Sequence, residues 1–177
     1  MVVWIIGLAG AGKSSIGQAV YQQLRAQDPA TVLLDGDHFR QVMGGDLGHS
    51  LGEREENGWR MCRLSQWLDS QGVNVVACVL SNFPEQQAWN RKHLDRYFEV
   101  YVDVPMEVLE ARDQKRLYSG ARTGAVRNVV GVDLPFNTPV SPDMVVRNDG
   151  PRENITQIAR EIVSAISERW PAEGDKG

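Results

Sequence analysis

Short apolar segments alternate along the chain with longer segments in which apolar residues recur at helical spacing. The apolar segments predict buried strands over Val2–Ile6, Thr31–Leu34, Val73–Leu80, Phe98–Val104 and Met144–Arg147. The segments between and after them predict helices over Ser14–Ala26, Gly58–Ser70, Glu85–Tyr97, Met106–Lys115 and Asn154–Trp170. Strands that are apolar on both faces are typical of a parallel sheet covered by helices. The alternation therefore predicts a doubly wound α/β sandwich.

The composition is that of an ordinary globular protein, and it narrows the classes of function. Of the 177 residues, 42% are hydrophobic and 24% are charged, and the net charge is −4. We expect one domain over residues 1–170 and a frayed tail over residues 171–177. The acidic balance argues against a broad surface for nucleic-acid polymers.

The start of the chain and its cysteines favour a cytoplasmic location. The apolar segment MVVWIIG is too short for a signal peptide or a membrane span, so no membrane partner is expected. Cys62 and Cys78 do not form a C-x-x-C pair. They predict two buried thiols in a reducing compartment, and not a zinc site.

A glycine-rich segment between the first predicted strand and the first predicted helix is the strongest chemical signal. GLAGAGKS, residues 7–14, matches the phosphate-loop pattern G-x-x-x-x-G-K-[ST] in the strand–loop–helix context that this pattern requires. Its glycines let backbone N–H groups turn toward phosphate oxygens. Lys13 is expected to reach the β- and γ-phosphates, and Ser14 to bind Mg²⁺. The predicted phosphate-binding residues are Gly7, Ala9, Gly10, Ala11, Gly12, Lys13, Ser14 and Ser15.

Two aspartates follow the second predicted strand, at the edge of the sheet where ligands of open α/β sheets bind. On an extended segment, Asp35 and Asp37 would point the same way because residues i and i+2 share a face. One carboxylate would orient Mg²⁺, and the other would accept a proton from an attacking hydroxyl. The competing interpretation is a plain Asp-Gly turn, which the nearby phosphate loop disfavours.

Other classes of nucleotide-using protein lack their characteristic residues in this chain. No N-K-x-D segment is present for recognising guanine. The predicted strand Val73–Leu80 ends in Ser81 and Asn82, where a motor or transporter ATPase would carry an acidic residue. These absences leave a small kinase as the favoured class.

A basic segment, RDQKRLYSGAR at residues 112–122, follows the fourth predicted strand and its helix. Arg112 and Arg116 are expected to bind the triphosphate from a lid that excludes water and neutralises the charge that develops during transfer. The alternative is a solvated basic helix face.

Several motifs, taken in order, resemble those of the adenylylsulfate kinases. They are GLAGAGKSS, LLDGDHFR, DLGHSLGEREEN, EVYVDVPMEVLEARD, KRLYSGARTG and NVVGVDLPF, and they span residues 1 to about 148. The resemblance implies a P-loop kinase sandwich with a five-stranded parallel sheet, usually a homodimer. It also implies transfer of the ATP γ-phosphate to the ribose 3′-hydroxyl of adenylylsulfate, as in sulfate assimilation.

The resemblance assigns roles to individual residues. Asp37 corresponds to the catalytic aspartate, with Lys13 and Asp35 as its catalytic partners, and Ser14 and Asp35 would hold Mg²⁺. Further positions match the acceptor-nucleotide site or the lid beside it: Arg40, Arg54, Asn57, Ser81, Lys115, Leu117 and Arg122.

The sequence departs from the family pattern mainly on the acceptor side. His49 and Val129 stand where the family has two phenylalanines that stack on the acceptor adenine. The family's ENIRR is ENGWR here, which introduces Gly58 and Trp59. Base–aromatic stacking contributes about 1–3 kcal/mol per base, so the loss of both rings predicts an altered acceptor. Two features would offset this loss in part: stacking by the ring of His49, and a displaced platform supplied by Trp59.

Two acceptors and one different class of function remain open. These features resemble homologues that act in surface-polysaccharide modification, one of which phosphorylates cytidine diphosphoramidate. A pocket with His49 and Val129 as walls would suit a base smaller than adenine. Adenylylsulfate stays the family default. The alternative of another class is a regulatory module that binds nucleotides without catalysis, which the retained Lys13, Asp35 and Asp37 disfavour.

Overall fold

A parallel sheet organises the chain, which a computed structural model describes over residues 1–80, 83–113, 116–150 and 154–171. The sheet has five strands in the order β2-β3-β1-β4-β5, and every neighbouring pair is parallel. The strands are β1 Val2–Ile6, β2 Thr31–Asp35, β3 Asn74–Val79, β4 Tyr97–Asp103 and β5 Met144–Arg147. The predicted α/β sandwich is therefore confirmed.

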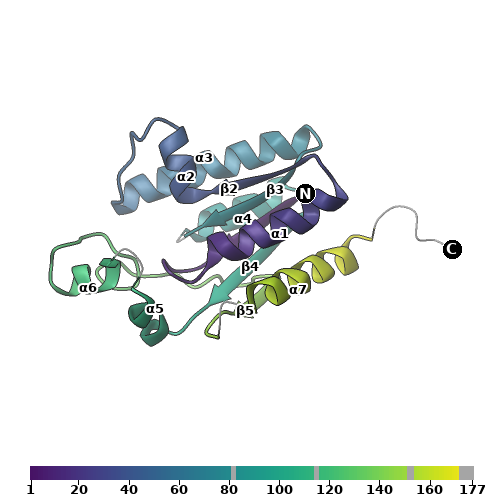
Figure 1. The fold of residues 1–177 in the computed structure, drawn as a ribbon. Helices are drawn as coiled ribbons and strands as arrows, with labels where there is room; N and C mark the ends of the chain where they lie inside the picture. Colours follow the sequence, from purple (N-terminus) through teal and green to yellow (C-terminus); the bar gives the residue numbers. More distant parts are fainter. Residues whose placement is uncertain (81–82, 114–115, 151–153, 172–177) are drawn as a thin grey trace.

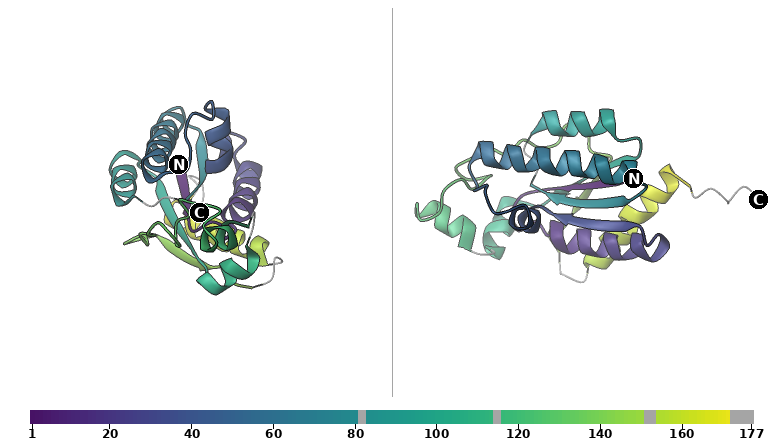
Figure 2. Two further views of the ribbon diagram at one scale, coloured as in Figure 1. Left: turned by 90° about the vertical axis from the view of Figure 1, so that its left-hand side faces the viewer. Right: turned by 90° about the horizontal axis from the view of Figure 1, so that it is seen from above.

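Helices cover both faces of this sheet (Figures 1 and 2). Helices α1 (Lys13–Gln27) and α7 (Asn154–Arg169) pack against each other on one face, and α3 (Leu51–Ser70) and α4 (Pro84–His93) cover the other. The central strand β1 supplies both cores, because Val3 and Ile5 join the α1–α7 side while Val2, Trp4 and Ile6 join the α3 side. This alternation follows from the two-residue period of a strand.

Three short helices lie near the end of the sheet toward which the strands point (Figure 1). They are α2 (Gly36–Val42), α5 (Met106–Arg112) and α6 (Leu117–Arg122). The hydrophobic pattern predicted neither α2 nor α6, because each is too short to show a helical period. Together with the phosphate loop and the loop before α3, they surround the carboxyl ends of the strands.

Helix α3 begins seven residues earlier than the apolar pattern predicts, at Leu51 and not at Gly58. Ser50 caps it by accepting a hydrogen bond from the Glu53 backbone N–H, and the Glu53 carboxylate accepts one from the Ser50 backbone N–H. This reciprocal capping box stabilises a first turn that carries little apolar surface. S-x-x-E at residues 50–53 was the sequence signal for this start.

The other predicted helix ends differ more modestly from the structure. The pattern predicts a helix as far as Tyr97. In the structure helix α4 ends at His93, and Tyr97 is the first residue of β4. Helix α5 ends at Arg112, where Asp113 has a φ of 28°. The predicted frayed tail falls on residues that the structure describes only at Pro171.

Both cysteines are free and buried, as predicted. Burial raises the pKa of each thiol to about 12, so neither is a thiolate at neutral pH. Within the described ranges, no helix is both long enough and apolar enough to cross a membrane.

Candidate active site

The glycine-rich loop leads from β1 directly into α1, so backbone N–H groups at the start of α1 face the carboxyl end of the sheet. Gly10 and Gly12 have φ values of 76° and 92°, a left-handed conformation that strongly favours glycine. Ala9, Gly10, Gly12, Lys13, Ser14 and Ser15 line one large cavity. Gly7 and Ala11 support the loop from behind, since Ala11 is fully buried and a Cβ on Gly7 would lie 2.8 Å from the Val102 carbonyl oxygen.

Three side chains from distant segments hold the shape of this loop by binding its carbonyl oxygens. Asn148 donates to Ala11 at 2.8 Å, and the Tyr118 hydroxyl donates to Ala9 at 2.7 Å. Arg112 donates to Gly10 at 3.4 Å and to the Asn148 carbonyl at 2.6 Å. Arg112 was predicted to bind the triphosphate from a lid, whereas in the structure its side chain supports the loop. Asn148 and Tyr118 were not predicted, because no local motif marks them.

Ser14 and Asp35 meet at the first turn of α1. The Ser14 hydroxyl donates to Asp35 Oδ2 at 2.5 Å, and the other oxygen of Asp35 accepts hydrogen bonds from the backbone N–H groups of Asp37 and His38. Asp35 is thus the N-cap of α2. A hydroxyl, a carboxylate and phosphate oxygens form the oxygen-only ligand set that suits Mg²⁺.

The predicted extended arrangement of the two aspartates is wrong. Residues 36–42 form helix α2, with Asp35 before it and Asp37 in its first turn. The reason is local, because the Asp35 carboxylate satisfies two N–H groups that a helix start leaves without partners. The two carboxylates still line the same cavity, as predicted.

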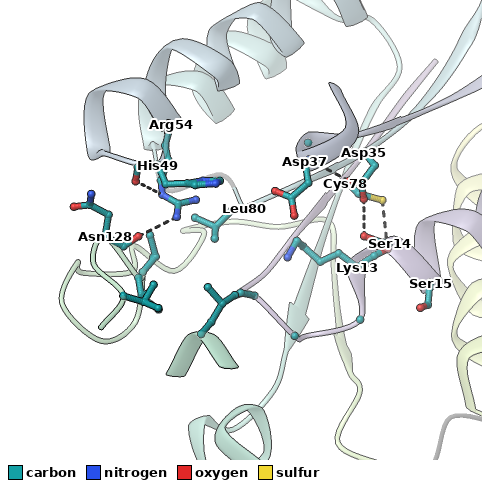
Figure 3. Close-up of a pocket in the computed structure, with 18 of the residues that line it drawn as sticks. Lys13, Ser14, Ser15, Asp35, Asp37, His49, Arg54, Cys78, Leu80 and Asn128 are labelled. Carbon is teal, nitrogen blue, oxygen red and sulfur yellow. Dashed lines mark hydrogen bonds between the residues drawn. The ribbon is translucent and has the colours of Figure 1, made fainter. Parts of the chain in front are cut away.

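Lys13 and Asp37 point toward one another across this cavity (Figure 3). The Lys13 ammonium donates to the Leu8 carbonyl at 2.8 Å. Burial lowers the pKa of Lys13, while the charges of Asp37 and Asp35 act in the opposite direction. The cavity therefore places a cation beside an exposed carboxylate, which is the pairing that phosphoryl transfer to a hydroxyl requires.

The large cavity has a volume of about 320 Å³ and joins the two halves of the predicted site. Its phosphate side is the glycine-rich loop with Asp35 and Asp37. On its far side lie His49, Arg54, Leu117 and residues 126–130. Figure 3 shows His49, Arg54 and Asn128 grouped together at a distance from Ser14 and Ser15. One cavity thus contains both the predicted phosphate donor site and part of the predicted acceptor site.

Arg54 connects the two walls of the acceptor side. Its Nε donates to the His49 carbonyl at 2.9 Å and its Nη2 donates to the Asn128 carbonyl at 2.9 Å (Figure 3). Asn128 has a φ of 64°, and the Asp133 carboxylate holds this turn by accepting from the backbone N–H groups of Asn128 and Val129. Those hydrogen bonds lower the pKa of Asp133.

Glu53 and Arg40 fix the loop that carries His49. The Glu53 carboxylate accepts hydrogen bonds from the Ser50 hydroxyl and from the backbone N–H groups of Gly48 and Ser50, which together lower its pKa to about 2. Arg40 donates to the Gly48 carbonyl at 2.6 Å. The His49 backbone is therefore anchored on both sides, while its side chain lies at the cavity mouth, partly buried and partly open to solvent.

The two positions that depart from the aromatic pattern both line the large cavity. Val129 is 4% exposed and packs into the core, so its side chain contributes an aliphatic wall. Partial burial and the charges of Arg54 and Arg40 lower the pKa of His49, so the pocket favours the neutral form of the ring. Among the described residues that line this cavity, none is Phe, Tyr or Trp.

The remaining predicted residues are placed as follows. Arg40 and Asn57 line a second, smaller cavity that shares Asp37 and Arg54 with the large one. Arg116 is exposed beside α6, and Arg122 pairs with Glu110.

Trp59 packs edge-on against Trp89, with ring centroids 6.0 Å apart, and lines neither cavity, so it does not replace the missing platform. Ser81 and Lys115 lie outside the described residues.

Comparison with protein families gives a match over most of the chain. The sequence model of the adenylylsulphate kinase family matches residues 1–147 of this chain. An adenylyl-sulfate kinase of Aeromonas salmonicida is 35% identical over 94% of this chain and 85% of its own length. A cytidine diphosphoramidate kinase of Campylobacter jejuni is 35% identical over 94% of this chain and 96% of its own length.

Comparison with solved structures also identifies an APS kinase as a similar protein. The Mycobacterium tuberculosis APS kinase CysC, solved in complex with AMPPNP and APS, superimposes with a TM-score of 0.84 at 33% identity. The match covers 94% of this chain and 96% of that one. A gluconokinase of Sinorhizobium meliloti, at 16% identity and a TM-score of 0.63, shares the fold.

Proposed function

The chain belongs to the adenylylsulphate kinase family and is a kinase that transfers phosphate to a hydroxyl group, and from that premise we propose that its acceptor is the ribose of a cytidine nucleotide. The acceptor that fits best is cytidine diphosphoramidate, the substrate in the name of one relative. Adenylylsulfate, in the names of several other relatives, is the second candidate.

One observation carries the choice of acceptor. The large cavity has one ring, that of His49, among its described lining residues, and Val129 forms an aliphatic wall. An adenine held there would lack the paired aromatic faces that contribute about 1–3 kcal/mol each. A cytosine has a smaller ring face than an adenine, so it loses less stacking energy when the aromatic side chains are absent. The second candidate keeps the support of the family match and of the APS-bound relative.

We propose that ATP binds on the loop side of the cavity. The N–H groups of residues 9–15 surround its phosphates, and Lys13 leaves the Leu8 carbonyl to contact the β- and γ-phosphates. Arg112 and Arg116 would neutralise charge from the α5–α6 side. Ser14 and Asp35 would hold Mg²⁺, which would neutralise part of the negative charge of the phosphates.

Asp37 is the proposed catalytic base. Its carboxylate faces Lys13 and lines both cavities, so an acceptor hydroxyl between it and the γ-phosphate meets both groups. Asp37 accepts the hydroxyl proton, the new O–P bond forms at the γ-phosphorus, and the bond to the β-phosphate oxygen breaks to release ADP. Arg40, Arg54 and Asn57 would bind the acceptor, with His49, Leu117 and Val129 beside it.

A coupled assay of ADP release tests this proposal against the non-catalytic alternative. The protein is given ATP, Mg²⁺ and either cytidine diphosphoramidate or adenylylsulfate, and ³¹P NMR identifies the product. We expect ADP and a ribose-phosphorylated nucleotide in equal amounts, and neither with Lys13→Ala. Tight binding of both nucleotides without ADP release would instead indicate a regulatory module. Homodimer formation and a role in polysaccharide modification remain predictions from the sequence resemblance.

A further inference from the structure

A small cavity of about 50 Å³ lies beside Asp37, on the side away from the phosphate loop. Arg40 of α2, Asn57 and Gly58 of α3 and Gln86 of α4 line it. A buried water needs only about 10–15 Å³, so a small tetrahedral group fits the space. The cavity adjoins the proposed acceptor site, because the two cavities share Asp37 and Arg54, so it is our candidate for the place of the acceptor's terminal group.

Polar atoms without partners gather around this cavity. Among the described residues, no hydrogen-bond partner exists for one buried atom on each of four residues that line this cavity: Trp4 Nε1, Arg40 Nε, Asn57 Oδ1 and Gln86 Oε1. Each of these atoms has less than 1 Å² of exposed surface. Buried polar groups in native proteins nearly always have partners. Unpaired atoms also occur on Ser65, Gln87 and Asn90, but only the four named here belong to residues that line a described cavity, where a ligand has room to bind.

The orientation of the Gln86 amide is fixed. Its Nε2 donates to the Glu55 carbonyl at 2.8 Å, and a carbonyl can only accept. The amide oxygen must therefore be the atom that faces away from Glu55. Gln86 is fully buried, so the packing around it also prevents another rotamer.

The absence of a side chain at Gly58 leaves the space that the Gln86 amide oxygen occupies. A Cβ at residue 58 would lie 2.2 Å from Gln86 Oε1 and 2.8 Å from its Cδ, far inside contact distance. A helix with glycine in its interior is less stable than the same helix with alanine. Glycine at residue 58 therefore lowers the stability of α3, but it leaves space for the Gln86 amide. Gly58 and Gln86, which both line the cavity, thus pack directly against each other, with the amide oxygen of Gln86 next to the Gly58 backbone.

We infer that Gln86 determines specificity by accepting a hydrogen bond from an N–H on the terminal group of the acceptor nucleotide, as a phosphoramidate supplies and a sulfate does not. This inference rests on the proposed function. Both groups are tetrahedral and both carry one negative charge when attached to a nucleotide. Arg40 and Arg54 therefore attract them equally. A sulfate would place oxygen lone pairs against the Gln86 oxygen, whereas the NH₂ of a phosphoramidate donates to it.

Four acceptors separate the terminal group from the base. They are cytidine diphosphoramidate, cytidine 5′-phosphosulfate, adenosine diphosphoramidate and adenylylsulfate, each assayed for kcat/KM with the wild-type protein. We expect the phosphoramidate to be preferred over the sulfate by about 10- to 100-fold with either base, the usual effect of leaving a buried polar group unpaired. Equal rates, or a preference for sulfate, would overturn the inference while leaving the kinase function intact. No turnover of any acceptor would refute the proposed function itself and the inference with it.

Gln86→Met tests the residue directly, because methionine has a similar volume and no amide oxygen. We expect the phosphoramidate-to-sulfate ratio to fall below about threefold. Each ratio is measured on one protein preparation, so partial unfolding cancels. The control is Gln87→Met, the same change at the next residue, which is buried but lines neither cavity and should keep the wild-type ratio. A wild-type ratio in Gln86→Met would contradict the assignment.

Discussion

Arg54 donates a hydrogen bond to the backbone carbonyl of Asn128, 74 residues further along the chain, at 2.9 Å. The same guanidinium donates to the His49 carbonyl, so one side chain sets the distance between the two walls of the acceptor site. The planar guanidinium presents several donors in a fixed geometry, which lysine cannot reproduce.

Arg54→Lys should therefore weaken acceptor binding much more than ATP binding. We expect the acceptor KM to rise by about tenfold or more, because loss of a charge-assisted hydrogen bond typically costs about 1.5–3 kcal/mol. Steady-state kinetics with each substrate varied in turn measures the two KM values. The control is Arg63→Lys, an exposed position on the same helix. Equal rises in both KM values would show that Arg54 supports the whole fold and not one wall.

Asp37→Asn should lower kcat and leave ATP binding nearly unchanged. The amide keeps the shape of the side chain but cannot accept the hydroxyl proton, and loss of a general base typically lowers the rate by about 10²- to 10⁴-fold. Single-turnover kinetics gives the rate of transfer, and isothermal titration calorimetry gives ATP affinity. A kcat within about threefold of the wild type would rule Asp37 out as the base.

Gly12→Ala should destabilise the phosphate loop for two reasons. The φ of 92° strains any residue with a Cβ, and that Cβ would lie 2.3 Å from Asn148 Nδ2, which holds the Ala11 carbonyl. The control is Gly72→Ala, where φ is 77° but no atom lies within 4 Å, so only the backbone strain of about 1–2 kcal/mol applies. Thermal denaturation should show a larger drop in Tm for Gly12→Ala, with weaker ATP binding. Equal drops would mean that Asn148 moves aside freely.

The side chain of His49 should titrate below its ordinary pKa of about 6.5. Burial is the main cause and the charge of Arg54 is the next, so Arg54→Met should raise the pKa only part of the way back. Because the folded protein favours the neutral ring, the contribution of this group to the free energy of unfolding is fully present above about pH 6.5. That contribution decreases as the pH falls from 6.5 through the lowered pKa, because the unfolded chain binds the proton more readily. NMR titration measures the pKa, with His49→Asn to assign the signal. A pKa of 6.5 or higher in the wild type would contradict the description of this pocket.

The phosphate side of the site could be predicted from the sequence, because its residues are contiguous. Lys13 and Ser14 follow from a local motif whose backbone geometry is set by Gly10 and Gly12. Asp37 was placed at the correct edge because strand ends in a parallel sheet meet there. Its helical setting was missed, since α2 depends on a cap and not on an apolar period.

The acceptor side depends on contacts between distant segments, which no local pattern reveals. Arg54 binds a carbonyl 74 residues away, and Gln86 meets Gly58 across two helices. The sequence did mark Gly58 as a departure from the family pattern, but only the position of the Gln86 amide gives a reason for it. Val129 was predicted as a pocket residue, and the structure adds that it is also part of the core.

Restoring phenylalanine at residues 49 and 129 should move the preference toward adenine. Two aromatic faces would contribute about 1–3 kcal/mol each to binding the larger base. We expect the His49→Phe, Val129→Phe double variant to raise kcat/KM for adenylylsulfate relative to cytidine diphosphoramidate by at least about tenfold. Val129 is buried, so circular dichroism must first show that the double variant is folded. An unchanged ratio in a folded variant would contradict the role of these walls.

The most direct test of the central claim is a competition in one tube. Equal concentrations of cytidine diphosphoramidate and adenylylsulfate are mixed with ATP, Mg²⁺ and the wild-type protein, and mass spectrometry measures the ratio of the two phosphorylated products at low conversion. Our account predicts that the cytidine product exceeds the adenine product by about tenfold or more. An excess of phosphorylated adenylylsulfate would contradict it.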